Sequence, residues 1–162
     1  MKVRDIMTKA PASCGMETNL CAATELLWNR DCGILAVVNN EQRVVGVVTD
    51  RDICIAVGTR NRLPSEMTVG EVASGNVFAC RTDDDVHTAL ATMAQGKVRR
   101  LPVIDADGKL EGLLSMDDII QHSASGKEAR PDSLTYHEVV ATLKSIFQAA
   151  PAEVRGRKIA AA

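Results

Sequence analysis

The stretch Gly46-Val47-Val48-Thr49-Asp50-Arg51-Asp52 returns later in the chain as Gly112-Leu113-Leu114-Ser115-Met116-Asp117-Asp118. Both copies contain a glycine, two apolar residues, a hydroxyl residue and, three positions later, an aspartate, at an offset of 66 residues. At this offset residues 3–53 align with residues 69–119, and 8 of the 51 aligned positions are identical. The chain is therefore built from two repeats, too few for a solenoid.

Each repeat predicts the order strand, helix, strand, strand, helix. In the second repeat, Val77 to Cys80 predicts a short strand, and the acidic run Asp83 to Asp85 suits a helix N-terminus. An apolar stripe at helical spacing follows and ends near Gly96. The stripe consists of Val86, Ala89, Leu90 and Met93, with Leu20, Ala23 and Leu27 as its looser counterpart in the first repeat.

Two apolar runs after this helix predict a hairpin in each repeat. They are residues 101–104 and 110–114 in the second repeat, around the turn sequence Asp105-Ala106-Asp107-Gly108, and residues 35–38 and 44–48 in the first. The hydroxyl and carboxylate residues that follow are typical N-caps of a helix.

The predicted organisation is a first repeat over residues 1–58, a linker over 59–68, a second repeat over 69–122 and an extension over 123–162. In the extension, Ser133 is the predicted cap of a helix over about 133–148. Its apolar face consists of Val139, Val140, Leu143, Ile146 and Phe147. This face either packs on its own module or a dimer mate, or it docks another protein.

Composition narrows the possible functions. The 162 residues are 46% hydrophobic, which suffices for one compact domain or two small ones, and the net charge of -2 gives no general attraction to nucleic acid. No apolar run approaches the roughly 20 residues that span a bilayer, and the N-terminus lacks a signal-like segment. We therefore expect a soluble cytoplasmic protein that binds neither nucleic acid nor membrane.

The cysteines and histidines predict no metal site or disulfide framework. The five cysteines form no C-x-x-C pair, and most are expected to be buried, with Cys14 and Cys80 at equivalent repeat positions. His87, His122 and His137 have no metal-ligand spacing. No glycine-rich phosphate loop and no catalytic constellation is visible, so an enzyme is not predicted.

The duplicated heptapeptide, each copy behind a hairpin and ahead of a helix, together with Leu101-Pro102-Val103-Ile104-Asp105, resembles the cystathionine β-synthase (CBS) domain family. The resemblance covers residues 3 to 122 and suggests a stand-alone Bateman module. It implies an α/β (α+β) fold of two β-α-β-β-α repeats packed as a pseudo-twofold pair, here with an added C-terminal helix. It also implies a disc-shaped homodimer.

Modules of this family bind adenosyl ligands such as AMP, ADP, ATP or S-adenosylmethionine between the two repeats. The resemblance assigns Asp52 and Asp118 to the ribose hydroxyls and Thr49 and Ser115 to the phosphate side. A carboxylate can accept from both hydroxyls of a cis-diol, and a helix N-terminus favours an anion.

We expect the two candidate sites to differ. Arg99 and Arg100, just ahead of the strand that begins at Leu101, suit ligand phosphates, and the first repeat has Gly33 and Ile34 there. These observations favour the Ser115/Asp118 site for a phosphorylated nucleotide. Cross-repeat geometry in the family adds Met7 to Ala12 to that site and Phe78 to the other. The expected ligand-binding residues are Asp118, Ser115, Arg99, Arg100, Leu101, Ala12, Asp52, Thr49 and Phe78.

The leading hypothesis is a regulatory module that needs no cofactor, senses an adenosyl nucleotide and signals in trans to a protein target through a change of shape or association. Two alternatives remain open. The hydroxyl and aspartate residues could be helix caps alone, with Arg99 and Arg100 a solvated edge. The repeats could also be a scaffold without ligand, with function carried by the C-terminal helix and the basic residues 155–158.

Overall fold

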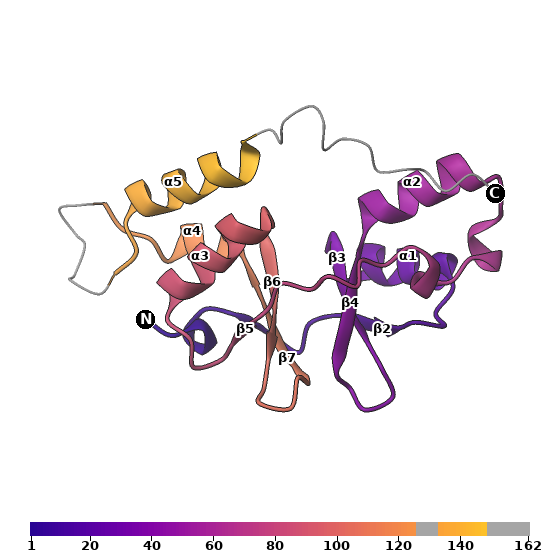
Figure 1. The fold of residues 1–162 in the computed structure, drawn as a ribbon, viewed down its shortest axis with the longest axis horizontal. Coiled ribbons are helices and arrows are strands. Elements are labelled where there is room, and N and C mark those ends of the chain that lie inside the picture. The colour runs from indigo at the N-terminus through magenta and orange to yellow at the C-terminus, as the bar shows by residue number, and fades with distance from the viewer. Residues whose placement is uncertain (126–132, 149–162) are drawn as a thin grey trace.

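A computed structural model describes residues 1–125 and 133–148 of the chain. Figure 1 shows two halves side by side, each with a small sheet covered by helices. The first repeat contains β2 (Ser13–Gly15), α1 (Leu20–Asn29), β3 (Ile34–Val38), β4 (Val44–Thr49) and α2 (Asp50–Arg60). The second contains β5 (Cys80–Arg81), α3 (Val86–Gly96), β6 (Arg100–Ile104), β7 (Leu110–Ser115) and α4 (Met116–Gln121). The remaining elements are β1 (Thr8–Lys9), α5 (Tyr136–Phe147) and short 3-10 turns at Val3–Asp5, Pro64–Glu66 and Val69–Glu71.

The predicted α/β fold of two β-α-β-β-α repeats with a C-terminal helix is confirmed. The hairpin strands β3 and β4 have the same bounds as β6 and β7 after the 66-residue shift. Two local predictions are wrong. The strand expected at Val77 to Cys80 lies later, at Cys80–Arg81, where β5 pairs with β6. The cap of α5 is Thr135 and not Ser133, because the Thr135 hydroxyl accepts from the backbone N–H of Glu138.

The two halves exchange segments, so the hydrophobic cores do not follow the repeat boundaries. β1, from the start of the chain, pairs antiparallel with β7 and forms the edge of the second repeat's sheet, in the order β1-β7-β6-β5. Val3 and Ile6 accordingly lie in the core of the second half. In return, Met67 and Val69 pack in the core of the first half. This exchange brings segments distant in sequence to the interface between the halves.

Close crossing of the exchanged segments explains the glycine of each heptapeptide. A Cβ atom on Gly112 would lie 3.0 Å from the carbonyl oxygen of Thr8 and 2.6 Å from the Met7 sulfur. On Gly46 it would lie 3.1 Å from the carbonyl oxygen of Ser74. A side chain at either position would therefore press on the crossing backbone, more severely at Gly112 than at Gly46.

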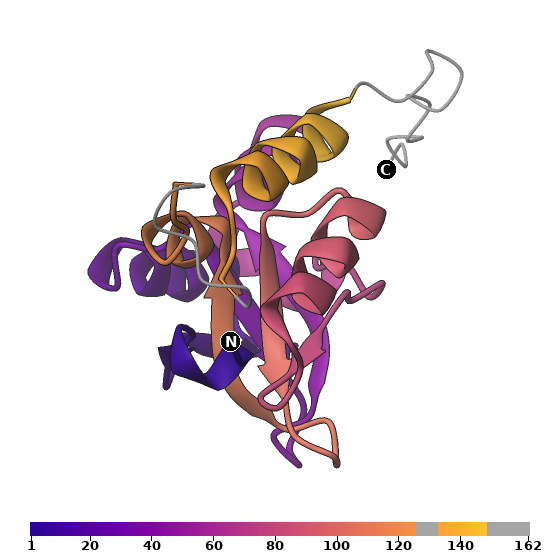
Figure 2. The same ribbon diagram turned by 90° about the vertical axis from the view of Figure 1, so that its left-hand side faces the viewer.

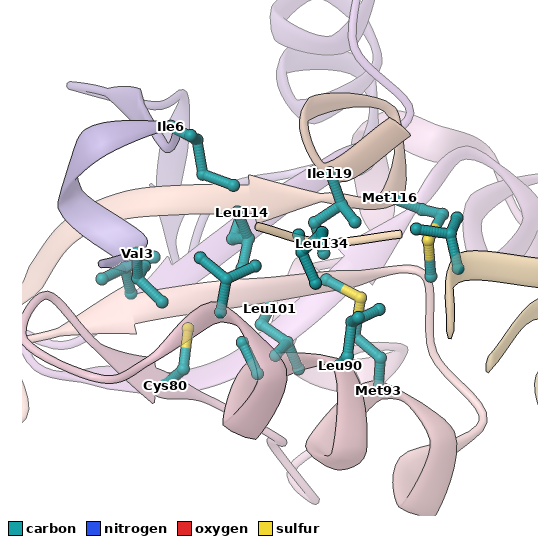
Figure 3. Packing of buried hydrophobic residues seen from close by; sticks show 14 residues of the cluster. Val3, Ile6, Cys80, Leu90, Met93, Leu101, Leu114, Met116, Ile119 and Leu134 are labelled. Atoms are coloured by element: carbon teal, nitrogen blue, oxygen red, sulfur yellow. The ribbon is translucent and has the colours of Figure 1, made fainter. Parts of the chain in front are cut away.

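The C-terminal helix α5 belongs to the second core. It packs mainly against α3 and also against α4, as both views of the fold show (Figures 1 and 2). Leu134, just before the helix, is fully buried in the cluster drawn in Figure 3, and Val139 joins it. Val140 and Phe147, by contrast, are 49% and 65% exposed. Within the described residues, no helix is long and apolar enough to cross a membrane.

The cysteine prediction holds in part. Cys14 and Cys80 are buried at equivalent positions, and burial raises the pKa of their thiols to about 11 and about 12. Cys21 and Cys54 are exposed, so the expectation that most cysteines are buried is wrong for them. Both lie on helices, on faces that the intramolecular core does not cover.

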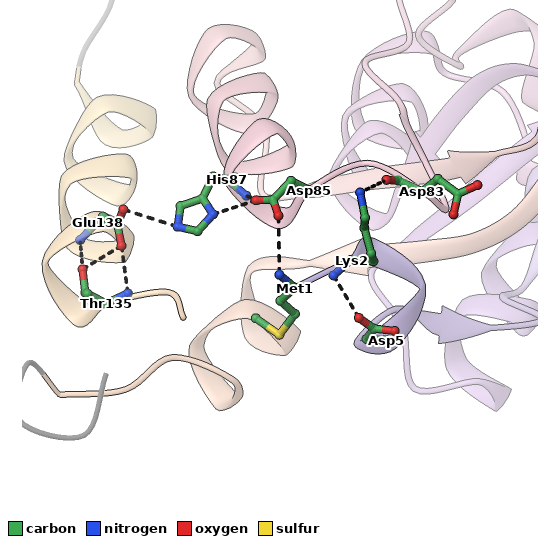
Figure 4. Close-up of polar contacts among 8 residues, drawn as sticks. All are labelled: Met1, Lys2, Asp5, Asp83, Asp85, His87, Thr135 and Glu138. Atoms are coloured by element: carbon green, nitrogen blue, oxygen red, sulfur yellow. Dashed lines mark hydrogen bonds and ion pairs between the residues drawn. The ribbon is translucent and has the colours of Figure 1, made fainter. Parts of the chain in front are cut away.

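A polar chain ties the start of α5 to the start of α3 (Figure 4). The ring of His87 lies between two carboxylates, with Nδ1 2.7 Å from Asp85 Oδ1 and Nε2 3.4 Å from Glu138 Oε1. Asp85 also caps α3 and contacts the amino group of Met1 at 3.4 Å. The N–H of Thr135 donates to Glu138 at 2.9 Å. These polar contacts together join the N-terminus, α3 and α5.

These contacts predict an acid-sensitive contribution to stability. Hydrogen bonds from the backbone N–H and the ring of His87 lower the pKa of Asp85 to about 2. A lowered carboxylate pKa stabilises the folded state above the unfolded pKa of about 3.9 and stops doing so as the pH falls through the folded pKa. We expect Asp85→Asn to lower the free energy of unfolding above pH 4, and this difference to vanish between about pH 4 and pH 2. Urea unfolding across that range measures it; a difference that persists at pH 2 would contradict the assignment.

Candidate functional site

Each heptapeptide folds into the same cap at the N-terminus of the helix that follows it. Thr49 Oγ1 and the Thr49 N–H donate to Asp52 Oδ2 at 2.7 and 3.0 Å, and the Asp52 N–H donates back to Thr49 Oγ1 at 3.2 Å. Ser115 and Asp118 repeat this arrangement at 2.6, 2.8 and 3.1 Å. The capping role predicted as the simple alternative is therefore present at both sites. Each aspartate accepts these hydrogen bonds through Oδ2, so its other carboxylate oxygen, Oδ1, takes no part in the cap.

A cavity of about 530 Å³ opens beside the first cap, and we name it cavity A. Its wall combines residues of both halves: Ile34, Val47, Thr49, Arg51, Asp52, Ser74, Asn76, Phe78, Gly96, Lys97, Val98, Arg99, Arg100 and Pro102. The ring of Phe78 lies so close to Gly96 that a Cβ atom there would be 2.6 Å from it. Cavity A is thus a cleft between the repeats with an aromatic wall, a cap carboxylate and several cations.

A second cavity, of about 420 Å³, lies beside the other cap and is named cavity B. It is lined by Thr8, Lys9, Ala10, Pro11, Ala12, Arg30, Asp31, Cys32, Gly33, Ile34, Arg100, Leu113, Ser115 and Asp117. Ile34 and Arg100 line both cavities, which places the starts of β3 and β6 between them. Of the predicted segment Met7 to Ala12, residues 8–12 line cavity B and Met7 is not in its wall, while Phe78 lines cavity A. A role of these residues in ligand binding stays a prediction.

The structure corrects three assignments at the Ser115/Asp118 site. Arg99 lines cavity A and not cavity B, and Arg100 lines both. Leu101 is fully buried in the second core, because its side chain points to the opposite face of β6 from Arg100. Asp117 takes part in the described wall of cavity B, whereas Asp118 lies behind Ser115 as its cap partner. Of the two arginines on which the preference for this site rested, only Arg100 lines cavity B, and it lines cavity A as well.

The charges of the two cavities differ at equivalent positions. At the 66-residue offset, Arg51, Lys97, Arg99 and Arg100 of cavity A correspond to Asp117, Asp31, Gly33 and Ile34 of cavity B. The wall of cavity A carries four basic residues and one acidic residue, Asp52. The wall of cavity B carries three basic residues, one of them the shared Arg100, and two acidic ones. The wall of cavity A therefore has the larger excess of basic over acidic residues.

Two residues that matter here were not assigned to a ligand by sequence reasoning. Arg51 lies inside the first heptapeptide, and Lys97 precedes Arg99 by two positions. A comparison of each cap with residues of the other repeat, and not only with residues of its own repeat, would have identified both. Among the described residues, no group of three or more His, Cys, Asp or Glu side chains is placed to bind a metal ion.

A larger hollow, of about 910 Å³, is an open groove between α1 and α2. Its wall includes Trp28, which is 85% exposed, together with Ile53, Cys54 and Val57. On the second half, α5 covers the related face: Leu143 and Phe147 close a hollow of about 230 Å³ against α4 and the start of β6. The first half thus presents an open apolar groove where the second half carries its own helix.

The two repeats have the same five elements and exchange segments, and a cavity lies beside the hydroxyl-aspartate cap of each. This is the two-repeat module that the sequence predicted. The family model for the CBS domain matches residues 3–58 and 69–125. The chain belongs to the CBS domain family.

Several known proteins are similar to this chain in sequence or in structure. An uncharacterised protein of Methanopyrus kandleri is 30% identical over 118 residues, which are 73% of this chain and only 58% of that relative's length. Hypoxic response protein 1 of Mycobacterium tuberculosis is 31% identical over 119 residues, 74% of this chain and 82% of that protein. A crystal structure of Hypoxic Response Protein I with two coordinated zinc ions has a TM-score of 0.69 at 30% identity, covering 75% of this chain and 98% of that one. The structure of CBSX2 of Arabidopsis thaliana in complex with AMP has a TM-score of 0.65 at 27% identity, covering 74% of this chain and 93% of that one.

Proposed function

We propose that this protein is a regulatory sensor that binds a phosphorylated adenosyl nucleotide in cavity A and signals in trans to another protein. The observation that carries the proposal is the concentration of Arg51, Lys97, Arg99 and Arg100 around the Thr49/Asp52 cap. A complex with AMP in a relative of the same fold supports the ligand class. Among the adenosyl compounds, ATP, ADP and AMP fit this charge better than S-adenosylmethionine, which carries positive groups of its own.

The side chains of cavity A suit the parts of a nucleotide. Asp52 Oδ1 would accept from the ribose hydroxyls, while Oδ2 remains in the cap with Thr49. The guanidinium groups of Arg51 and Arg99 would bind phosphate oxygens, for which their geometry is well matched. Phe78, held against Gly96, would pack on the base.

Cavity B would discriminate against nucleotides with several phosphates. Asp31 and Asp117 stand where cavity A has Lys97 and Arg51, so they would repel a polyanion. We therefore expect one tight site for ATP or ADP per chain, with cavity B empty or occupied by an adenosyl ligand of lower negative charge.

The proposed output is a change of shape or of association. A ligand in cavity A touches both halves, so it would favour the relative orientation that best closes the cleft. A partner that prefers that orientation would be regulated by the ligand. The open groove between α1 and α2 suits the homodimer that we expect for the active form, because an exposed apolar hollow of this size favours a protein contact.

Ligand-dependent unfolding tests the proposal. Thermal unfolding is followed with AMP, ADP, ATP, S-adenosylmethionine and NAD, and calorimetry gives the number of sites. A ligand at 100 times its dissociation constant should add about 2.7 kcal/mol to the free energy of unfolding. We expect ATP or ADP to give the largest shift with one site per chain. If none of the five compounds binds, the sensor proposal fails and the scaffold hypothesis, in which α5 carries the function, replaces it.

A further inference from the structure

We propose that a nucleotide in cavity A loosens the C-terminal end of α5, so that this helix reports occupancy of the cavity. The inference rests on the proposed function and adds the route by which binding would be transmitted. It assigns Lys97 as the shared residue: its ammonium group holds α5 in the structure and faces the phosphates of a bound nucleotide.

Lys97 stands between the two sites. Its Nζ donates to the backbone carbonyl of Gln148, the C-cap of α5, at 3.2 Å, and the residue also lines cavity A. The backbone of Lys97 is fixed, because it caps α3 in a left-handed conformation with φ of 51°. The Lys97 side chain therefore extends from a fixed backbone position, and its ammonium group can bind either the C-cap carbonyl of α5 or a phosphate of the ligand.

Arg99 makes a second link between the cavity and the helix. It lines cavity A and also the hollow closed by Leu143 and Phe147 of α5. The buried contacts lie earlier, at Leu134 just before the helix and at Val139 within it, whereas Leu143 and Ile146 are only partly buried against the core. Phe147 is 65% exposed, so the last turn of α5 is held less firmly than its start. The end of α5 is thus the part that a small change at Lys97 can release.

Two effects of a bound phosphate act in the same direction. It competes with the Gln148 carbonyl for the ammonium group of Lys97. It also brings negative charge toward the C-terminal end of α5, where the helix dipole is negative and where a cation stabilises. Both effects weaken the attachment of the last turn, and by reciprocity a loosened α5 favours the nucleotide.

Hydrogen exchange in the full-length protein tests the inference, with ATP as the probe and calorimetry to establish saturation. We expect the amides of residues 143–147 to exchange about two- to fivefold faster with ATP bound, the size expected for losing a cation at a helix C-terminus. Lys97→Met should show the faster exchange without ATP and no further rise with it. Arg51→Met is the matched control, because Arg51 lines the same cavity but not the hollow that Leu143 and Phe147 of α5 close; at saturating ATP it should keep the full response.

The outcomes separate this inference from the proposed function. If calorimetry shows ATP binding while exchange in α5 stays unchanged or slows, the coupling is overturned and the sensor proposal survives. If Lys97→Met responds to ATP as the wild type does, Lys97 is not the link. If ATP, ADP and AMP all fail to bind, both proposals fall together.

Discussion

Replacing Asp52 with alanine is expected to weaken ATP binding by about ten- to a hundredfold. The substitution removes the carboxylate that would accept from the ribose hydroxyls, and a hydrogen bond to a charged group contributes about 1.5–3 kcal/mol. Since about 1.4 kcal/mol corresponds to a factor of ten in affinity, the loss of one such bond gives the stated range. Calorimetric titration of the purified variant with ATP measures the change directly.

Asp118→Ala is the matched control. Asp52 and Asp118 form the same cap, with donors at 2.7 and 3.0 Å in the first case and 2.6 and 2.8 Å in the second. Both variants should therefore lose a similar amount of stability, about 1 kcal/mol for a helix cap. Only Asp52→Ala should lose affinity for ATP. Equal losses of affinity would show that both cavities bind ATP, and a loss confined to Asp118→Ala would restore the site first favoured from the sequence.

Most of the fold was predictable because the sequence contains it twice. The apolar runs around residues 105–108 and the caps at Thr49 and Ser115 lie where the periodicity and turn residues place them. The cap of α5 was misplaced by two residues, since Ser133 and Thr135 are both good caps by type and only the Glu138 contact distinguishes them. The strand β5 was placed too early because nothing local marks where a two-residue strand pairs.

The site was harder to predict, since it depends on which half each segment joins. Arg99 and Arg100 were assigned to the heptapeptide of their own repeat, because neighbours in sequence were taken as neighbours in the site. The segment exchange that pairs β1 with β7 shows the opposite arrangement, in which residues from one half complete the cavity of the other. No local pattern encodes this crossing. Its one sequence trace is the pair of glycines at positions 46 and 112, which make room for the crossing backbone.

Leu134→Ala is expected to lower the free energy of unfolding by about 2–5 kcal/mol. Leu134 is fully buried among residues of α3, β6, β7 and α4, and replacing a buried leucine with alanine leaves a cavity as well as losing apolar contact. Such a loss is a large share of the roughly 5–15 kcal/mol that stabilises a typical domain. Urea unfolding of the full chain, followed by far-ultraviolet circular dichroism, gives the value.

Val140→Ala is the control for Leu134→Ala, because Val140 lies on α5, which begins shortly after Leu134, and is 49% exposed. It should change stability by less than about 0.5 kcal/mol. A large effect at Leu134 with a small one at Val140 means that α5 begins inside the second core and that only its far end is free to respond to a ligand. If Leu134→Ala were as mild as Val140→Ala, α5 would be a loosely held arm. The scaffold hypothesis, with the helix as a docking surface, would then explain the extension better than a sensor in which α5 reports the state of cavity A.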